Sequence, residues 1–273
     1  MDLSNENIIH IKKDNVEYIQ FRKLLEYKNI THCYTLKSDG KLNFRSENNA
    51  TMLKSYENIS RELGFTNIIK PKQTHSDNIT IIENNERNLN EIDGLITNEK
   101  NVTLGTTSAD CISLLFYDPN KNVIANVHSG WRGTEKGIAK KTVQELIEKF
   151  NCQPKDIICC ICPSIRKCHF EVDEDVKELF WQKYKNLPHI EEIIQKGKVV
   201  EETIQKEKII EKKQKYHIDT VKINQELLKQ IGLKQENIID SNICTMCHPE
   251  YFHSYRVDKE NSGRNAAMIS LIN

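Results

Sequence analysis

Short apolar runs separated by polar residues cover most of the chain and predict strands, with a few stretches of helical spacing between them. Residues 8–36 alternate as antiparallel strands do. Further strands are predicted within 67–83, 93–118, 123–129, 156–162 and 265–272. Apolar residues at helical spacing predict helices within 51–65, 134–150, 173–184 and 220–232. This mixture indicates an α/β or α+β fold without internal repeats.

Two of the predicted helices have clear start or stop signals. The first is expected to end at Gly64 and to bury one apolar face, formed by Leu53, Tyr56, Ile59 and Leu63. The helix within 134–150 has Thr134 as its predicted N-cap.

Composition and charge narrow the classes of partner. The chain has 273 residues, with 39 basic and 39 acidic side chains, so no net charge favours nucleic acid or a membrane surface. No apolar run approaches the roughly 18 residues that span a bilayer, and the N-terminal residues lack the apolar core of a signal peptide. We therefore expect a cytoplasmic protein whose nine cysteines are reduced thiols.

One segment is too polar to contribute much to a core. Between Glu191 and Lys215, 13 of 25 residues are charged. We interpret residues from about 189 to 216 as a solvated excursion from a single domain that spans 1–273.

Turn-forming residues between the apolar runs 111–117 and 123–129 predict a β-hairpin. A turn centred on Pro119 and Asn120 would place Cys111 directly opposite His128, with their Cβ atoms about 4.5–5.5 Å apart. One sulfur and one imidazole nitrogen at that spacing can share a metal ion or form a thiolate–imidazole pair. A buried cysteine and a hydrogen-bonded histidine is the structural alternative.

The residues after His128 suggest a binding loop. Ser129, Gly130 and Gly133 provide flexibility, and the helix start that follows offers free N–H groups to an anion, to which Arg132 could add a bidentate contact. Trp131 would give an apolar wall or a stacking face, or would be an ordinary core residue.

Two C-x-x-C pairs suggest other cofactors. The run Cys244 to His248 has the form of a c-type haem attachment site, which belongs to exported proteins and is therefore disfavoured here. Cys159 and Cys162 could join Cys244 and Cys247 in a structural zinc site. That site is also disfavoured, because 82 positions separate Cys162 from Cys244 and because residues 156–162 indicate a buried strand.

Four blocks of the sequence resemble the YfiH family of laccase-domain proteins, which carry both multicopper polyphenol oxidase and purine nucleoside phosphorylase as labels. The blocks are KPKQTHSDNI, DGLIT with TSADCISLLFYD, ANVHSGWRGTEKGI and CTMCHPEYFHSYRVDKENSGRNAAMI. Weaker matches at 42–44, 162–172 and 215–228 extend the resemblance across nearly the whole chain.

The resemblance implies a layered α/β/β/α sandwich and a catalytic zinc site made of His75, Cys111 and His128, with copper as the alternative metal. Two histidines, one cysteine and an open position suit a metal that acidifies water or polarises a substrate oxygen. The implied activity is phosphorolysis of adenosine, inosine and methylthioadenosine to free base and sugar 1-phosphate, together with deamination of adenosine.

Such a reaction needs phosphate contacts, for which Arg132, Arg256 and Arg264 are candidates. Deamination also needs a carboxylate for proton transfer, with Asp93, Asp110 and Glu171 as candidates.

The chain departs from the family pattern at substrate-contact positions and keeps the three metal ligands. Near the N-terminus the family often has an arginine that this chain lacks, and Lys37 could take over its contact. The chain also has Val257 where the family often has a second arginine, and Cys162 and Pro163 where the family often has Gly-Pro.

Three other functions stay open on the sequence. A copper polyphenol oxidase would require several coppers and more clustered histidines than the sequence suggests. A cysteine hydrolase or amidase acting on a cell-wall precursor would use Cys111 as nucleophile and His128 as base. A non-enzymatic protein would use the metal for structure or storage.

Overall fold

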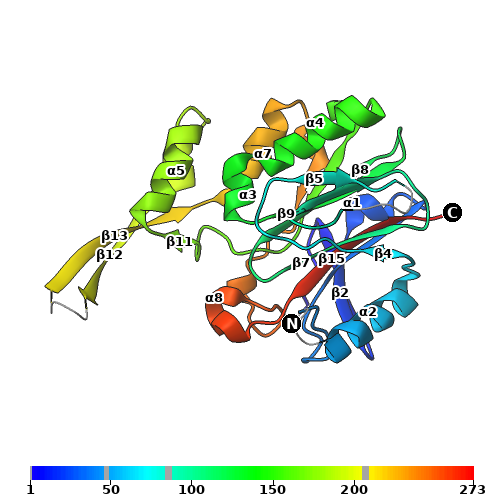
Figure 1. Ribbon diagram of the computed structural model, residues 1–273, viewed down its shortest axis with the longest axis horizontal. Coiled ribbons are helices and arrows are strands. Elements are labelled where there is room, and N and C mark those ends of the chain that lie inside the picture. The colour runs from blue at the N-terminus through cyan, green and yellow to red at the C-terminus, as the bar shows by residue number, and fades with distance from the viewer. Residues whose placement is uncertain (1, 46–48, 84–87, 205–208) are drawn as a thin grey trace.

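Two six-stranded sheets form the centre of the structure, a computed structural model that describes residues 2–45, 49–83, 88–204 and 209–273 (Figure 1). The first sheet has the order β1 (Ile8–Lys13), β2 (Val16–Phe21), β3 (Ile30–Thr35), β15 (Asn265–Leu271), β7 (Thr103–Ser108) and β4 (Ile68–Ile69). The second has the order β14 (Ile238–Asp240), β10 (Ile158–Ile161), β8 (Ile112–Asp118), β9 (Val123–Ser129), β6 (Gly94–Thr97) and β5 (Ile79–Ile81).

The two sheets face each other across a common apolar core. This core takes buried side chains from both sheets, among them Ile19, Tyr34, Leu104 and Ile269 from the first and Leu115, Ile124, Ile158 and Cys160 from the second. The strands β8, β9 and β15 at the centres of the sheets are buried on both faces, because helices cover the outer faces.

Helices form the two outer layers. On the first sheet, α2 (Asn49–Leu63) packs Met52, Tyr56 and Ile59 against strand residues such as Met268. On the second sheet, α4 (Ile138–Phe150) and α7 (Thr220–Gln230) pack against the outer face of β8, β9 and β10. The order of layers is thus α/β/β/α, as the resemblance implied, and the mixed fold class is confirmed.

The remaining elements lie at the ends of these layers. A third sheet has the order β11 (Glu171–Val172), β13 (Ile209–Ile218) and β12 (Ile194–Ile204). The short helices are α1 (Arg22–Leu25), α3 (Trp131–Lys136), α5 (Glu174–Tyr184), α6 (Ile190–Ile193) and α8 (Tyr255–Asp258), with 3-10 turns η1 (Pro154–Asp156), η2 (Gln235–Asn237), η3 (Thr245–Cys247) and η4 (Lys259–Asn261). No helix among the described residues is long and apolar enough to cross a membrane.

The predictions for these two helices need three corrections. In α2, Leu53 is 63% exposed, and Met52 on the neighbouring position is buried instead. Thr134 is not an N-cap, because the helix already begins at Trp131 and the Thr134 amide donates to the Gly130 carbonyl inside it. The predicted single helix is also divided, since Gly137 adopts a left-handed conformation (φ 81°) between α3 and α4.

The predicted register of the β8–β9 hairpin was wrong by two positions. His128 pairs with Ser113, and Ile112 pairs with Ser129, so Cys111 lies diagonal to His128. The buried carboxylate of Asp118 causes the difference, because its Oδ1 accepts hydrogen bonds from the amides of Asn120 and Lys121 and moves the turn toward the second strand. A shift of two residues keeps side chains on the same face, so the predicted proximity survives.

Most described residues of the charged segment 191–215 lie in the paired strands β12 and β13, which extend away from the two central sheets (Figure 1). Gln195, Lys196, Lys198 and Glu201 are exposed along it. Its base is not solvated, because Ile193, Ile194 and Ile218 are buried with residues of α5 and α7.

A buried asparagine joins the two sheets through hydrogen bonds. Asn126 of β9 accepts from the Thr106 hydroxyl (2.7 Å) and donates to the carbonyls of Leu104 and Ala267 (both 2.8 Å), all three in the first sheet. Its side chain is fully buried. The network is therefore a specific polar contact inside an apolar interface.

We predict that Asn126→Ala lowers the free energy of unfolding by about 2–4 kcal/mol, because three buried hydrogen bonds of about 1 kcal/mol each are lost. Urea denaturation would measure the change. The control Asn120→Ala, at an exposed turn position, should shift the value by less than about 0.5 kcal/mol. Equal effects of the two substitutions would contradict the role of Asn126.

Candidate metal centre and substrate cavity

Three chain segments converge at one end of the second sheet. The connection from β4 to β5 leaves the first sheet, carries His75 and enters the second. The connection from β7 to β8 does the same and carries Cys111, while His128 lies near the end of β9. Because β9 runs antiparallel to β8, the end of β9 meets the start of β8. The topology thus brings together residues from three separate motifs.

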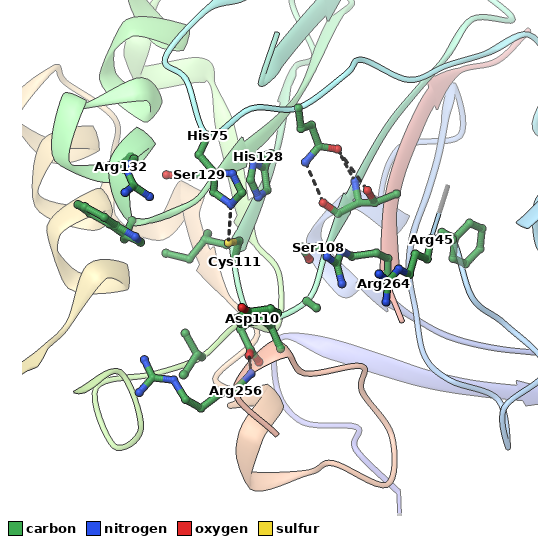
Figure 2. A pocket seen from close by; sticks show the side chains of 18 of the residues that line it. Arg45, His75, Ser108, Asp110, Cys111, His128, Ser129, Arg132, Arg256 and Arg264 are labelled. Carbon is green, nitrogen blue, oxygen red and sulfur yellow. Dashed lines mark hydrogen bonds between the residues drawn. The ribbon is translucent and has the colours of Figure 1, made fainter. Parts of the chain in front are cut away.

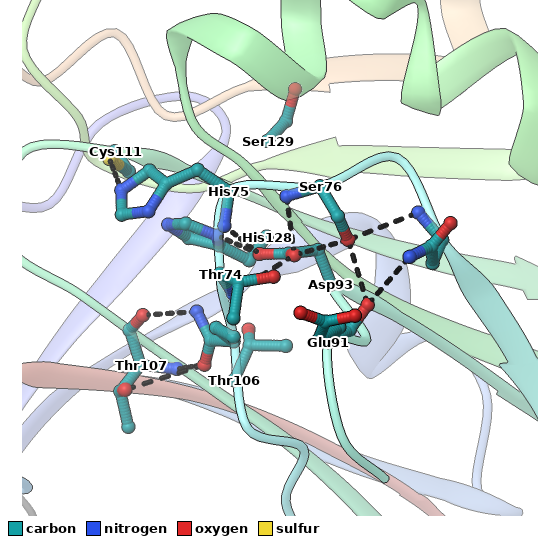
Figure 3. Close-up of polar contacts among 12 residues, drawn as sticks. Thr74, His75, Ser76, Glu91, Asp93, Thr106, Thr107, Cys111, His128 and Ser129 are labelled. Atoms are coloured by element: carbon teal, nitrogen blue, oxygen red, sulfur yellow. Dashed lines mark hydrogen bonds and ion pairs between the residues drawn. The ribbon is translucent and has the colours of Figure 1, made fainter. Parts of the chain in front are cut away.

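The three side chains are close enough to share one metal ion. Their ligand atoms lie within 4.8 Å of one another, and the Cys111 sulfur is 3.8 Å from His75 Nε2. The two imidazoles meet edge to face, with ring centroids 5.0 Å apart (Figure 3). His128 is buried, Cys111 is half-buried and His75 is exposed, so the group opens toward solvent on one side.

Gly130 allows this close approach. A Cβ atom at that position would lie 2.7 Å from His75 Cδ2 and 3.4 Å from both Cys111 Sγ and His128 Cε1. Any larger residue would push the imidazole of His75 away. The glycine in the H-S-G-W-R-G block is therefore explained by packing at the cluster rather than by loop flexibility.

The buried carboxylate of Asp93 orients the side chain of His128 and holds the backbone at His75 (Figure 3). Its Oδ1 accepts from His128 Nδ1 at 2.7 Å, and its oxygens also accept from the amides of His75 (3.2 Å) and Ser76 (2.7 Å). A proton on His128 Nδ1 leaves Nε2 with a free lone pair for a metal. Asp93, offered from sequence as a proton-transfer group, instead lies behind His128 and positions it.

Hydrogen bonds and charge attraction favour the ionised forms of Asp93, Cys111 and His128. Burial would raise the pKa of Asp93, but hydrogen bonds from His128 and Ser76 outweigh it and lower the pKa to about 2. Burial likewise opposes the ionised forms of Cys111 and His128. Their mutual attraction nevertheless lowers the pKa of Cys111 to about 6, and with Asp93 raises that of His128 to about 9. A thiolate is therefore available at Cys111 near neutral pH.

The donor set fits a metal ion with an open position. Two imidazoles and one thiolate are zinc ligands, and three protein ligands leave a fourth position for water or substrate. Two histidines and one cysteine also occur at mononuclear copper sites. Donor type alone thus supports a metal without selecting between zinc and copper.

The group opens into a cavity of about 800 Å³. Four arginines line it: Arg45, Arg132, Arg256 and Arg264. Figure 2 shows Arg132 on one side of Cys111, and Arg45 with Arg264 on the other side, beside Ser108. Aromatic residues also line the cavity, namely Phe44, Tyr56, Trp131, Phe170 and Tyr255. Among the described lining residues Asp110 is the acidic one, so the cavity favours anions.

The predicted arginines all reach the cavity, but each also has a local contact. The Arg132 guanidinium stacks on the Trp131 ring, 4.2 Å from its centroid. Arg256 donates to the Glu171 carbonyl (3.1 Å), and Arg264 donates to the carbonyls of Ser262 and Gly263. The anion site predicted at a helix start by Thr134 is wrong in position, because the six-residue α3 begins three residues earlier.

Two other residues predicted from the sequence to serve the site lie outside the cavity. Lys37 is absent from the described lining residues and donates to the Pro249 carbonyl instead. Glu171 is likewise outside the lining, and its carboxylate lies 3.7 Å from His217.

Asp110 lines the cavity, but its oxygens accept from Thr245 Oγ1, Ser254 Oγ and the Arg256 amide, which makes it a structural carboxylate. Arg45 was not among the residues predicted from the sequence. Its position is marked only by the weak match at 42–44 that directly precedes it.

Comparison with known proteins identifies the family. Residues 41–272 match the family model described as multi-copper polyphenol oxidoreductase laccase. The chain is 32% identical to the purine nucleoside phosphorylase YlmD of Bacillus subtilis over 73% of this chain and 69% of that protein. A purine nucleoside phosphorylase of Clostridium acetobutylicum is 32% identical over 93% of this chain and 98% of its own length.

Two further proteins extend the comparison. A protein of an unknown prokaryote named adenosine deaminase RL5 is 29% identical over 76% of both chains. The crystal structure of the YfiH protein from Bacillus licheniformis superposes with a TM-score of 0.80 at 25% identity, covering 96% of this chain and 98% of the other. With its fold and nearly its whole length matched, the chain belongs to the laccase-domain family described as multi-copper polyphenol oxidoreductase laccase.

Proposed function

We propose that this protein is a zinc-dependent purine nucleoside phosphorylase that also deaminates adenosine. Relatives named purine nucleoside phosphorylase and adenosine deaminase, at about 30% identity, support an enzyme that processes nucleosides. The observation that carries the proposal is the cavity itself, where a His75, Cys111 and His128 ligand set faces arginines and aromatic rings.

The cavity offers the three components that phosphorolysis of a nucleoside requires. Arginine guanidinium groups form bidentate contacts with phosphate, and Arg132, Arg256 and Arg264 are our candidates for that role. Trp131, or Tyr255 on α8, offers a face for a purine ring. A zinc ion held by His75, Cys111 and His128 would polarise a substrate oxygen or acidify a water molecule.

The chain's own residues would act mainly by orientation. Asp93 holds His128 in the required tautomer and fixes the backbone of the segment that carries His75. Asp110 precedes Cys111 and is itself held by three hydrogen bonds, which fixes the loop on the other side. The substrate would meet preorganised groups rather than mobile ones.

A second chemistry has one specific observation in its favour. The lowered pKa of Cys111 and the raised pKa of His128 describe the thiolate–imidazole pair that a cysteine hydrolase or amidase would use. Activity retained under chelation, together with covalent trapping of Cys111 by an electrophile, would favour it. The copper oxidase has less support, since the other His/Cys group among the described residues contains a single histidine.

We predict that the purified protein releases adenine from adenosine and hypoxanthine from inosine only when phosphate is present, and that Cys111→Ala abolishes the release. Chromatography of a nucleoside panel, with and without phosphate, would measure both effects. Release that is unchanged without phosphate would exclude phosphorolysis. Oxidation of phenols by protein loaded with copper, without nucleoside cleavage, would support the polyphenol oxidase instead.

The phosphate role of Arg132 gives a second expectation. Arg132→Ala should raise the KM for phosphate about 10- to 100-fold, because a charge-assisted contact of about 1.5–3 kcal/mol is lost. Arg61→Ala is the control, since Arg61 is an exposed residue of α2 that pairs with Glu57. An unchanged KM for phosphate in the Arg132 variant would remove this residue from the anion site.

Asp93→Asn should weaken zinc binding at the His75, Cys111 and His128 site about 10- to 100-fold, because the amide no longer fixes the imidazole of His128 as a carboxylate does. Competition with a chromophoric chelator would measure the affinity. Asp77→Asn, which removes a carboxylate paired with Lys136 and Lys141 at the surface, is the matched control. Equal affinities in both variants would show that Asp93 does not position the ligand.

A further inference from the structure

A second cluster of metal-binding side chains lies outside the cavity. Cys168 and His169 belong to the connection between β10 and β11. Cys244 directly precedes the turn η3, and Cys247 is its last residue. The four ligand atoms lie within 4.8 Å of one another. Main-chain contacts align the two segments, because the Ser164 amide donates to the Ile243 carbonyl and the Thr245 amide to the Ser164 carbonyl.

The distances within this cluster match a tetrahedral zinc site. With zinc bonds of about 2.3 Å to sulfur and 2.0 Å to nitrogen, tetrahedral geometry places two sulfurs about 3.8 Å apart and a sulfur and a nitrogen about 3.5 Å apart. The Cys168 and Cys247 sulfurs are 3.9 Å apart. His169 Nδ1 lies 3.2, 3.6 and 3.5 Å from the sulfurs of Cys168, Cys244 and Cys247.

We propose that Cys168, His169, Cys244 and Cys247 bind a structural zinc ion. Three thiolates and one imidazole complete the four positions that zinc prefers, so no position is left for substrate, in contrast to the group at the cavity. The two C-x-x-C pairs of the sequence do not combine, because Cys159 and Cys162 are buried in and next to β10. The partners of Cys244 and Cys247 come from the next loop instead.

A disulfide and a haem attachment site both fit this cluster less well than zinc does. A disulfide between Cys168 and Cys247 would need the sulfurs at about 2.05 Å, and it would give the imidazole of His169 no role among three sulfurs. Haem attachment would use His248 as an iron ligand, but His248 lies outside the group and its Nδ1 is 3.8 Å from a Glu250 carboxylate oxygen.

The proposed zinc would brace one wall of the cavity. Thr245, between two of the ligands, donates its hydroxyl to Asp110 Oδ1 at 2.7 Å. On the other segment, the Ile165 amide donates to the Asp110 carbonyl at 2.8 Å. Asp110 adopts a left-handed conformation (φ 78°) directly before Cys111. Zinc that joins the two segments would therefore help to hold the loop that presents Cys111.

Metal analysis of the full chain tests this site independently of enzymatic activity. Protein purified under reducing conditions from zinc-containing medium should hold two zinc ions per chain by mass spectrometry. Cys111→Ala should hold one, which would be the ion of the second cluster. Adding Cys247→Ser to that variant should remove the remaining ion, whereas adding His248→Ala, the neighbouring residue outside the cluster, should retain it.

A spectroscopic measurement covers the case in which the Cys247 variant does not fold. Zinc-edge X-ray absorption of the Cys111→Ala protein should show three sulfurs and one nitrogen around the metal. Three results would overturn the proposal: a Cys111→Ala protein without zinc, a different ligand shell for its zinc, or a Cys168–Cys247 disulfide found by peptide mapping without reduction.

Discussion

The buried carboxylate of Asp93 is the contact on which the candidate site depends. It lies directly before β6, which begins at Gly94, and is completely removed from solvent. A bare carboxylate in that position would be costly, so it is satisfied by the imidazole of His128, the hydroxyl of Ser76 and the backbone of residues 74–76. These bonds join the segment that carries His75 to the strand that carries His128.

The rest of the site follows from topology. Two connections cross from the first sheet to the second at the same end, and each presents one ligand. A layered sandwich with helices outside leaves this end uncovered, so a cavity forms there, and arginines from four different segments line it. A preorganised group of candidate metal ligands beside a basic, aromatic cavity suits a substrate with an aromatic ring and an anionic co-substrate.

Much of this could be predicted from the sequence, and the failures have physical causes. The strands, the layered class and the proximity of Cys111 and His128 follow from apolar periodicity, turn chemistry and the family resemblance. The predicted hairpin register was wrong because Asp118 pairs with Val123, so the turn covers residues 119–122 and is not centred on Pro119 and Asn120. The Asp118 carboxylate stabilises this longer turn locally, through the amides of Asn120 and Lys121. The predicted start of α3 was wrong because its N-cap is Gly130, which has no side chain that would mark a helix start in the sequence. Arg45 and the pairing of Cys168 and His169 with Cys244 depend on long-range folding and leave no local pattern.

We expect His75, Cys111 and His128 to hold one catalytic metal ion at the mouth of the cavity. Anomalous diffraction at the zinc edge, from crystals of protein purified without added metal, tests it most directly. A bound zinc ion should give a peak about 2.0 Å from the Nε2 atoms of His75 and His128 and about 2.3 Å from Cys111 Sγ, with an open position facing the arginines. A crystal with no anomalous peak among these three side chains, measured on active protein, would contradict it.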